Sequence, residues 1–124
     1  MTKKEAITAQ FSQALVALKK ALDQPKDEFV RDSAIQRFEF SFDLAWKTIK
    51  TTLEEDHGVI CNSPKECFRQ AYQQKIIEYD DYWLEITDLR NKTTHTYSEQ
   101  TAEEIYHQLP KVLEELSDLA KKLS

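Results

Sequence analysis

The sequence predicts an all-α fold, an up-and-down helical bundle of four main helices plus a short helix. Apolar side chains recur at spacings of three and four along nearly the whole chain, which is the period of an α-helix. The 124 residues include one glycine and three prolines, where average usage would give roughly nine glycines. Families of tight β-hairpins, dinucleotide fingerprints and glycine-rich phosphate loops are therefore excluded. The length suits a single domain over residues 1–124.

Two long helices are expected first. Apolar residues at helical spacing predict a helix over residues 3–23, which ends at Gln24-Pro25-Lys26. A second helix is predicted from about Asp27 to His57, with its main apolar stripe at Ile35, Phe38, Phe42, Ala45, Trp46, Ile49 and Leu53.

The second predicted helix is apolar on two sides. Phe40 and Leu44 lie about 200° from Phe38 and Phe42, at 100° per residue. A helix that is apolar on two sides is buried on two sides. We expect it to be the central helix of the bundle or to form part of a subunit interface.

The next helix boundaries are marked by capping residues. Gly58, the only glycine, stands where a left-handed helix C-cap is expected. Ser63 is a predicted N-cap, followed by Pro64 at the first helical position and Glu66 at the capping-box position. These signals predict a short helix after residue 63.

The remaining two helices follow from periodicity. One segment places a set of apolar residues on a single face, namely Tyr79, Tyr82, Trp83, Ile86 and Leu89. The last helix is predicted from Thr101, with Glu104 completing a capping box, to about Lys122. Pro110 falls inside this helix and is expected to kink it.

The composition suggests a cytoplasmic protein without a membrane segment. No apolar run approaches the roughly 20 residues of a membrane span, and the polar start does not resemble a signal peptide. We therefore interpret Cys61 and Cys67 as reduced thiols. The net charge of −5 argues against a broad basic face for nucleic acid, although a small local site remains compatible with it.

One segment interrupts the helical pattern. Three threonines at positions 93, 94 and 96 favour local hydrogen bonds over a helix, so residues 91–100 are predicted to contain a helix end, a tight connection and the next N-cap. On a continuous helix Arg90 and His95 would diverge by about 140°. A break between them allows the two side chains to converge.

The same segment carries a recognisable motif. Residues 90–97 match R-x-x-x-x-H-x-Y, the signature of one branch of the HEPN domains. The second helix also resembles that family, through Arg37-Phe38-Glu39-Phe40 and Leu44-Ala45-Trp46-Lys47. The chain thus resembles the HEPN toxins encoded beside a minimal nucleotidyltransferase antitoxin, earlier described as nucleotidyltransferase substrate-binding proteins.

This resemblance implies metal-independent cleavage of RNA, without a cofactor, at a site formed across a homodimer. Arg90 would bind phosphate and His95 would transfer protons, chemistry that suits a permanent planar cation and a group titrating near neutrality. Since each chain supplies one motif histidine, His95 of one subunit would act as base and His95 of the other as acid.

The resemblance also implies a regulatory residue and supporting groups. Tyr97 would receive adenylate from the partner nucleotidyltransferase, which would block RNA by bulk and negative charge. The supporting candidates are Asn91, Arg37, Glu39 and Lys47.

Two other interpretations arise from the residues. The chain could be a non-catalytic substrate-binding or adaptor subunit of a two-component nucleotidyltransferase, which also predicts a dimeric bundle. It could also be a helical bundle with no active site. A metal site at His57, Cys61 and Cys67 is not predicted, because the C-x-x-C spacing and a fourth ligand are absent.

Overall fold

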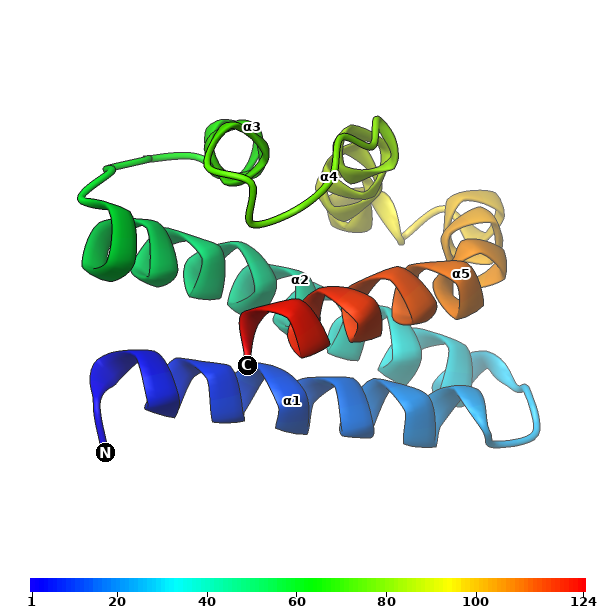
Figure 1. Cartoon of the computed structure of the whole chain (residues 1–124). Coiled ribbons are helices and arrows are strands. Elements are labelled where there is room, and N and C mark those ends of the chain that lie inside the picture. The colour runs from blue at the N-terminus through cyan, green and yellow to red at the C-terminus, as the bar shows by residue number, and fades with distance from the viewer.

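The computed structural model describes all residues 1–124 and consists of α-helices without strands (Figure 1). The helices are α1 (Lys3–Leu22), α2 (Glu28–His57), α3 (Pro64–Gln73), α4 (Tyr82–Lys92) and α5 (Glu99–Leu123), with a one-turn 3₁₀ helix η1 (Thr93–His95) before α5. The predicted all-α bundle is confirmed. The bundle has three long helices and two short ones, where four main helices and one short helix were predicted. The difference is α4, which has 11 residues and is nearly as short as α3, which has 10.

Helix α2 is the centre of the bundle. It packs against α1, α3, α4 and α5. In Figure 1, α1 and α2 form a hairpin, α5 crosses in front of α2, and α3 and α4 lie side by side, seen nearly end-on. A single core of 26 buried residues joins all five helices, and its largest fully buried side chains are Phe11, Phe38 and Phe42.

The predicted caps at Ser63 and Gly58 are confirmed, and the predicted start of the second helix at about Asp27 is confirmed as well. The Asp27 carboxylate accepts the Val30 N–H at 2.7 Å, and the Ser63 hydroxyl accepts the Glu66 N–H at 3.3 Å. Gly58 ends α2 with φ +65°, the left-handed conformation that glycine adopts without steric cost.

Two predicted boundaries were wrong, and in each case a nearby capping residue explains the difference. Tyr79 lies in the loop before α4, because the Asp80 carboxylate accepts the Tyr82 N–H at 2.9 Å and starts the helix there. Helix α5 begins at Glu99, two residues before the predicted Thr101, because the Ser98 hydroxyl accepts the Thr101 N–H at 3.3 Å. Helix α5 then continues through Pro110.

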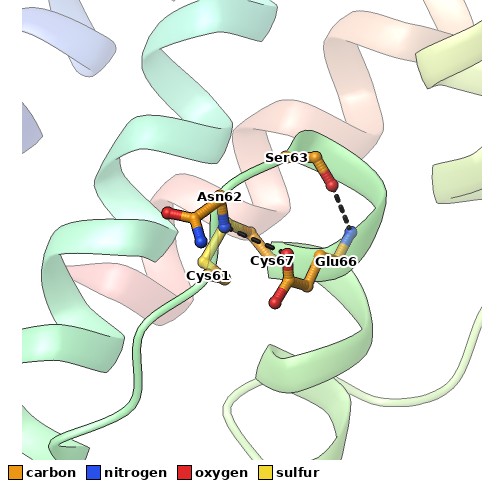
Figure 2. The surroundings of a disulfide bond; sticks show 5 residues. All are labelled: Cys61, Asn62, Ser63, Glu66 and Cys67. Carbon is orange, nitrogen blue, oxygen red and sulfur yellow. Dashed lines mark hydrogen bonds between the residues drawn. A yellow bond between two sulfur atoms is a disulfide. The ribbon is translucent and has the colours of Figure 1, made fainter.

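The interpretation of the two cysteines as free thiols was also wrong. Cys61 and Cys67 form a disulfide with their Cα atoms 5.2 Å apart, and both are fully buried (Figure 2). The loop after Gly58 folds back onto the first turn of α3, where the Asn62 N–H also donates to Glu66 at 3.1 Å. This loop closure brings the two Cα atoms within the range that a disulfide spans.

The second apolar side of α2 is only partly covered within one chain. The central position of α2 explains its main buried face, yet Phe40 is 54% exposed and Phe29 is 82% exposed. Phe29 and Phe40 are therefore two large apolar side chains of α2 that face solvent in the single chain.

None of the helices combines the length and the apolar character that crossing a lipid bilayer requires.

Candidate functional site

The motif segment occupies the junction between α4 and α5. Helix α4 ends at Lys92, η1 adds one tighter turn, and Ser98 starts α5. The threonines bond locally, as predicted: the Thr93 hydroxyl donates to the Arg90 carbonyl at 2.7 Å, and the Thr94 hydroxyl donates to the Asn91 carbonyl at 3.1 Å. The regular α-helix is thus interrupted between Arg90 and His95.

Arg90 is anchored to α2 by two carboxylates. Its Nε and Nη2 donate to the two oxygens of Asp43 at 3.3 and 3.1 Å, and Nη1 donates to the Thr93 hydroxyl at 2.8 Å. The Glu39 carboxylate lies 3.3 Å from Nη1. The side chain of Arg90 is 24% exposed, so the cluster lies at the surface rather than in the core.

Two carboxylates contact Arg90, namely Glu39, which the resemblance of the second helix indicated, and Asp43, which it did not. Partial burial raises the pKa of Glu39 above its usual range; the Asp43 carboxylate adds to this effect and Arg90 opposes it. Glu39 was a predicted supporting residue, whereas Asp43 was missed. The available signal was its spacing, since residues four apart share a helix face.

His95 and Tyr97 form a separate pair. Both side chains are exposed, Tyr97 to 84%. The Tyr97 hydroxyl lies 3.4 Å from His95 Nδ1, and the two rings meet edge to face with centroids 5.9 Å apart. Arg90 makes no hydrogen bond to either residue, so one chain divides the motif into an Arg90 cluster and a His95–Tyr97 pair.

The side chains of the other supporting candidates make no hydrogen bond or ion pair with Arg90, His95 or Tyr97. Arg37 donates to the Ala17 carbonyl of α1 at 2.7 Å, which holds its guanidinium against α1. The Lys47 side chain is exposed and makes no ion pair. Asn91 is exposed at the end of α4. No group of three or more histidine, cysteine or acidic side chains is arranged to hold a metal ion.

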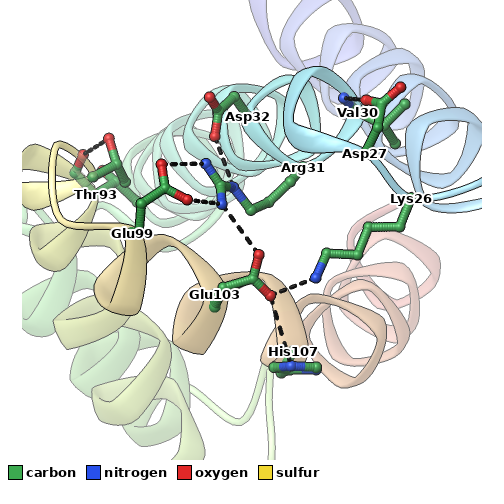
Figure 3. Close-up of polar contacts among 10 residues, drawn as sticks. Lys26, Asp27, Val30, Arg31, Asp32, Thr93, Glu99, Glu103 and His107 are labelled. Atoms are coloured by element: carbon green, nitrogen blue, oxygen red, sulfur yellow. Dashed lines mark hydrogen bonds and ion pairs between the residues drawn. The ribbon is translucent and has the colours of Figure 1, made fainter.

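A buried arginine that sequence reasoning missed holds the start of α5. Arg31 of α2 is 3% exposed and donates to both oxygens of Glu99, at 2.7 and 3.3 Å (Figure 3). It also donates to Glu103 at 3.1 Å and to Asp32 at 3.0 Å. Because Glu99 follows Tyr97 by two residues, this network determines where the motif turn ends.

The network shifts the pKa values of its members. Hydrogen bonds to Glu99 and Asp32 raise the pKa of Arg31 despite burial. The hydrogen bond from Arg31 lowers the pKa of Glu99, and those from Lys26 and Arg31 lower the pKa of Glu103. Both glutamates are therefore held in the ionised form.

Comparison with known proteins places this arrangement in a family. The family model described as "Nucleotidyltransferase substrate binding protein like" matches residues 7–124. The chain belongs to this family. A curated relative from Haemophilus influenzae, named probable ribonuclease HepT, is 33% identical over 94 residues. That alignment covers 73% of this chain and 64% of the relative, so the chain spans less than two thirds of the relative's length.

Two solved structures share the fold of this substrate-binding family member. A crystal structure of a protein from Thermus thermophilus superposes with a TM-score of 0.83 at 32% identity and covers 91% of this chain and 98% of that chain. A Haemophilus influenzae protein, described as showing the fold of a substrate binding domain of a nucleotidyltransferase, superposes with a TM-score of 0.71 at 28% identity. The matched regions are 97% of this chain and 96% of that one.

The lowered pKa values predict an acid-sensitive contact between α2 and α5. Carboxylates whose folded pKa is depressed contribute stability above their unfolded pKa of about 4.3, and this stability is lost as the pH falls through the folded values. The double variant Glu99→Gln/Glu103→Gln should therefore be less stable than the wild type at pH 7 and should lose less stability than the wild type between pH 7 and pH 3. Urea unfolding followed by circular dichroism measures both differences.

The matched control is Glu54→Gln/Glu55→Gln, which removes two exposed carboxylates that make no ion pair. It should keep the acid sensitivity of the wild type. Equal acid sensitivity in the Glu99/Glu103 variant and the wild type would contradict the assignment.

Proposed function

We propose that the protein is a metal-independent endoribonuclease toxin that acts as a homodimer and is neutralised when a partner nucleotidyltransferase adenylylates Tyr97. The observation that carries this proposal is the R-x-x-x-x-H-x-Y segment at the α4–α5 junction, where His95 and Tyr97 are exposed and Arg90 is partly exposed. Similarity to a protein named probable ribonuclease HepT supports the same class of activity.

The chemistry follows from the side chains. A ribose 2′-hydroxyl attacks the adjacent phosphate when a base removes its proton and an acid protonates the leaving 5′-oxygen, so the phosphate ends as a cyclic diester. Imidazole suits either proton transfer near neutral pH. The Nε2 atom of His95 has no partner within the chain and is available for substrate, while Nδ1 lies near the Tyr97 hydroxyl.

Arg90 would stabilise the negative charge that develops on the phosphate. Asp43 holds the guanidinium through two hydrogen bonds, whereas Glu39 lies against a single nitrogen at 3.3 Å. Burial raises the pKa of the Glu39 carboxylate, against the opposing charge of Arg90. We therefore assign Asp43 to orienting Arg90, and Glu39 is the contact that an incoming phosphate would displace.

A second copy would complete the site. Phe29 and Phe40 are 11 residues apart on α2 and point within about 20° of each other, and both are exposed. Leu44 extends this apolar face and is partly exposed. Asp43 borders it, so a copy packed on α2 would lie next to the Arg90 cluster. The dimer would supply the second His95 that separate acid and base roles require.

Tyr97 is suited to modification because it is 84% exposed and precedes the cap of α5. An attached adenylate would add bulk and negative charge beside His95, which would repel the phosphates of RNA. The family description and the description of one similar structure both concern nucleotidyltransferases, which supports a partner of that class.

A second candidate function is a non-catalytic adaptor that presents a substrate, or itself, to a separate nucleotidyltransferase. The specific observation in its favour is that most donors of Arg90 are already used by Asp43, Thr93 and Glu39 within the chain. In that case the cluster would serve as a structural tie between α4 and α2.

Cleavage of RNA in the presence of EDTA separates the two candidates. The wild type should cleave a mixed-sequence RNA, and Arg90→Ala and His95→Ala should each reduce the rate by about 10²-fold or more. His57→Ala, which changes an exposed histidine at the far end of α2, should cleave as the wild type does. Wild-type protein that never cleaves RNA under these conditions would favour the adaptor function.

The apolar face of α2 predicts a dimer that depends on Phe40. Sedimentation equilibrium should find the wild type dimeric and Phe40→Glu monomeric, because a buried unpaired carboxylate at the interface is unfavourable. RNA cleavage should be lost together with the dimer. Ile60→Glu, a matched change at another exposed apolar residue, should leave the protein dimeric. An active Phe40→Glu monomer would show that one chain is sufficient.

Tyr97→Phe should retain the toxic activity and lose its regulation by the partner nucleotidyltransferase. The variant should retain RNA cleavage and inhibit growth, because the phenol hydroxyl is the modified atom and not a proton donor in the reaction. Incubation with the partner nucleotidyltransferase and ATP should leave its mass unchanged in intact-protein mass spectrometry. Tyr106→Phe, at a partly buried tyrosine of α5, should still gain adenylate. A normal mass increase in Tyr97→Phe would exclude Tyr97 as the acceptor.

A further inference from the structure

A pocket with aromatic walls lies between α3 and α4, away from the motif segment. It has a volume of about 140 Å³. Its floor is formed by Phe68 and Trp83, whose buried rings stack with centroids 4.9 Å apart. Tyr72 and Tyr79 line it as an edge-to-face pair with centroids 5.4 Å apart, and Leu84 also lines it.

Three large apolar side chains in the wall of this pocket are exposed to solvent. Tyr79 is 65% exposed, Tyr72 46% and Leu84 43%, and they are three of the nine exposed large hydrophobic residues of the chain. Single exposed apolar residues are common on protein surfaces, whereas a cluster of them around a hollow marks a binding surface.

The hollow continues beyond the pocket. Ile77, Glu78 and Tyr79 also line a second hollow of about 200 Å³, whose other wall is formed by Glu115, Asp118 and Leu119 of α5. We call the two together the Tyr79 groove. It runs from α3 and α4, past Tyr79, to α5, a length that suits a peptide segment better than one isolated small molecule.

Carboxylates are concentrated in the Tyr79 groove. Glu78, Asp80 and Asp81 lie in the connection to α4, and Glu115 and Asp118 lie on α5. None of the five makes an ion pair. The groove also contains cations, of which Lys65 is neutralised by Asp88 at 3.0 Å, while Arg69 and Lys122 make no ion pair.

The α5 end of the groove is the most negative part. Burial raises the pKa of Glu115, and the neighbouring charges of Asp80 and Asp118 raise it further, against an opposing effect of Lys111. A cation placed among these groups would relieve their mutual repulsion. A polyanion such as RNA would increase it.

We propose that the Tyr79 groove binds a segment of a partner protein that carries an aromatic or aliphatic anchor with lysine or arginine beside it. The anchor occupies the pocket over Phe68 and Trp83, where an apolar side chain is removed from water. The basic residue contacts the carboxylates of Glu115 and Asp118.

The position of the groove separates it from the motif. Trp83 and Arg90 are seven residues apart on α4, or about 10 Å along the axis. A protein bound in the groove would therefore leave the Arg90 cluster open while lying next to it. This binding chemistry is independent of the proposed ribonuclease function.

Selection of peptides on the full-length protein tests the proposal. The probe is a display library of short random peptides, and the strongest binders are synthesised with a fluorescent label. Selected sequences should combine an aromatic or aliphatic residue with neighbouring lysine or arginine. Their affinity, measured by fluorescence anisotropy, should fall about tenfold in Tyr79→Ala/Leu84→Ala and by a similar factor in Glu115→Gln/Asp118→Asn.

Matched controls change similar residues outside the groove. Val16→Ala removes an exposed apolar side chain of α1, and Glu54→Gln/Glu55→Gln removes two exposed carboxylates of α2; both should bind the peptides as the wild type does. Circular dichroism confirms that each variant is folded. Because the aromatic and acidic variants change different elements, loss of folding in one leaves the other as a test.

The proposal is overturned if the selected peptides lack basic residues, or if their affinity is the same in the groove variants and the wild type. It is also overturned if single-stranded RNA displaces the peptides and its own binding falls in the groove variants, since the groove would then be an RNA subsite. RNA cleavage by the same variants is measured separately. Failure of the ribonuclease assay with retained peptide binding would reject the proposed function and leave this inference standing.

Discussion

The burial of α2 is the constraint on which the rest of the structure depends. One face of this helix carries Phe38 and Phe42 into the core, and every other α-helix packs against it. The polar residues at the margins of that face then determine how the chain after α4 is held. Arg31 and Asp43 belong to the same helix as the core phenylalanines, so the position of the motif segment follows from the position of α2.

The α4–α5 junction is tied to α2 from both sides. Before the turn, Arg90 at the end of α4 bonds Asp43; after it, Glu99 at the start of α5 bonds Arg31. His95 and Tyr97 lie between these two ties, on a turn whose ends are held while its side chains face solvent. This arrangement presents an imidazole and a phenol at a defined place without burying either, as a site for RNA or for a modifying enzyme requires.

Three surfaces of the molecule involve different residues. The motif turn lies at the α4–α5 junction, the exposed phenylalanines lie along α2, and the Tyr79 groove lies between α3, α4 and α5. A second copy on α2 and a partner protein in the groove can therefore bind without competing for the same residues.

Helix caps could be predicted from the sequence, because a capping residue bonds to backbone groups only a few positions away in the chain. The caps at Ser63 and Gly58 are of this kind. The starts of α4 and α5 were misplaced because Asp80 and Ser98 begin these helices at positions that the apolar periodicity alone does not indicate. Local capping signals compete, and which of them acts depends on how the following helix packs.

The helical period, the side chains of the motif and the interruption of the helix around its threonines can all be read from the order of the amino acids. Which groups the motif side chains contact depends on how the helices pack together. Arg90 and Asp43 are 47 residues apart, and Arg31 and Glu99 are 68 apart. Such pairs depend on the angle and register at which helices pack, which the spacing of residues along one helix does not specify. The disulfide of Cys61 and Cys67 and the Tyr79 groove arose in the same way, from loops whose paths are set by the helices they join.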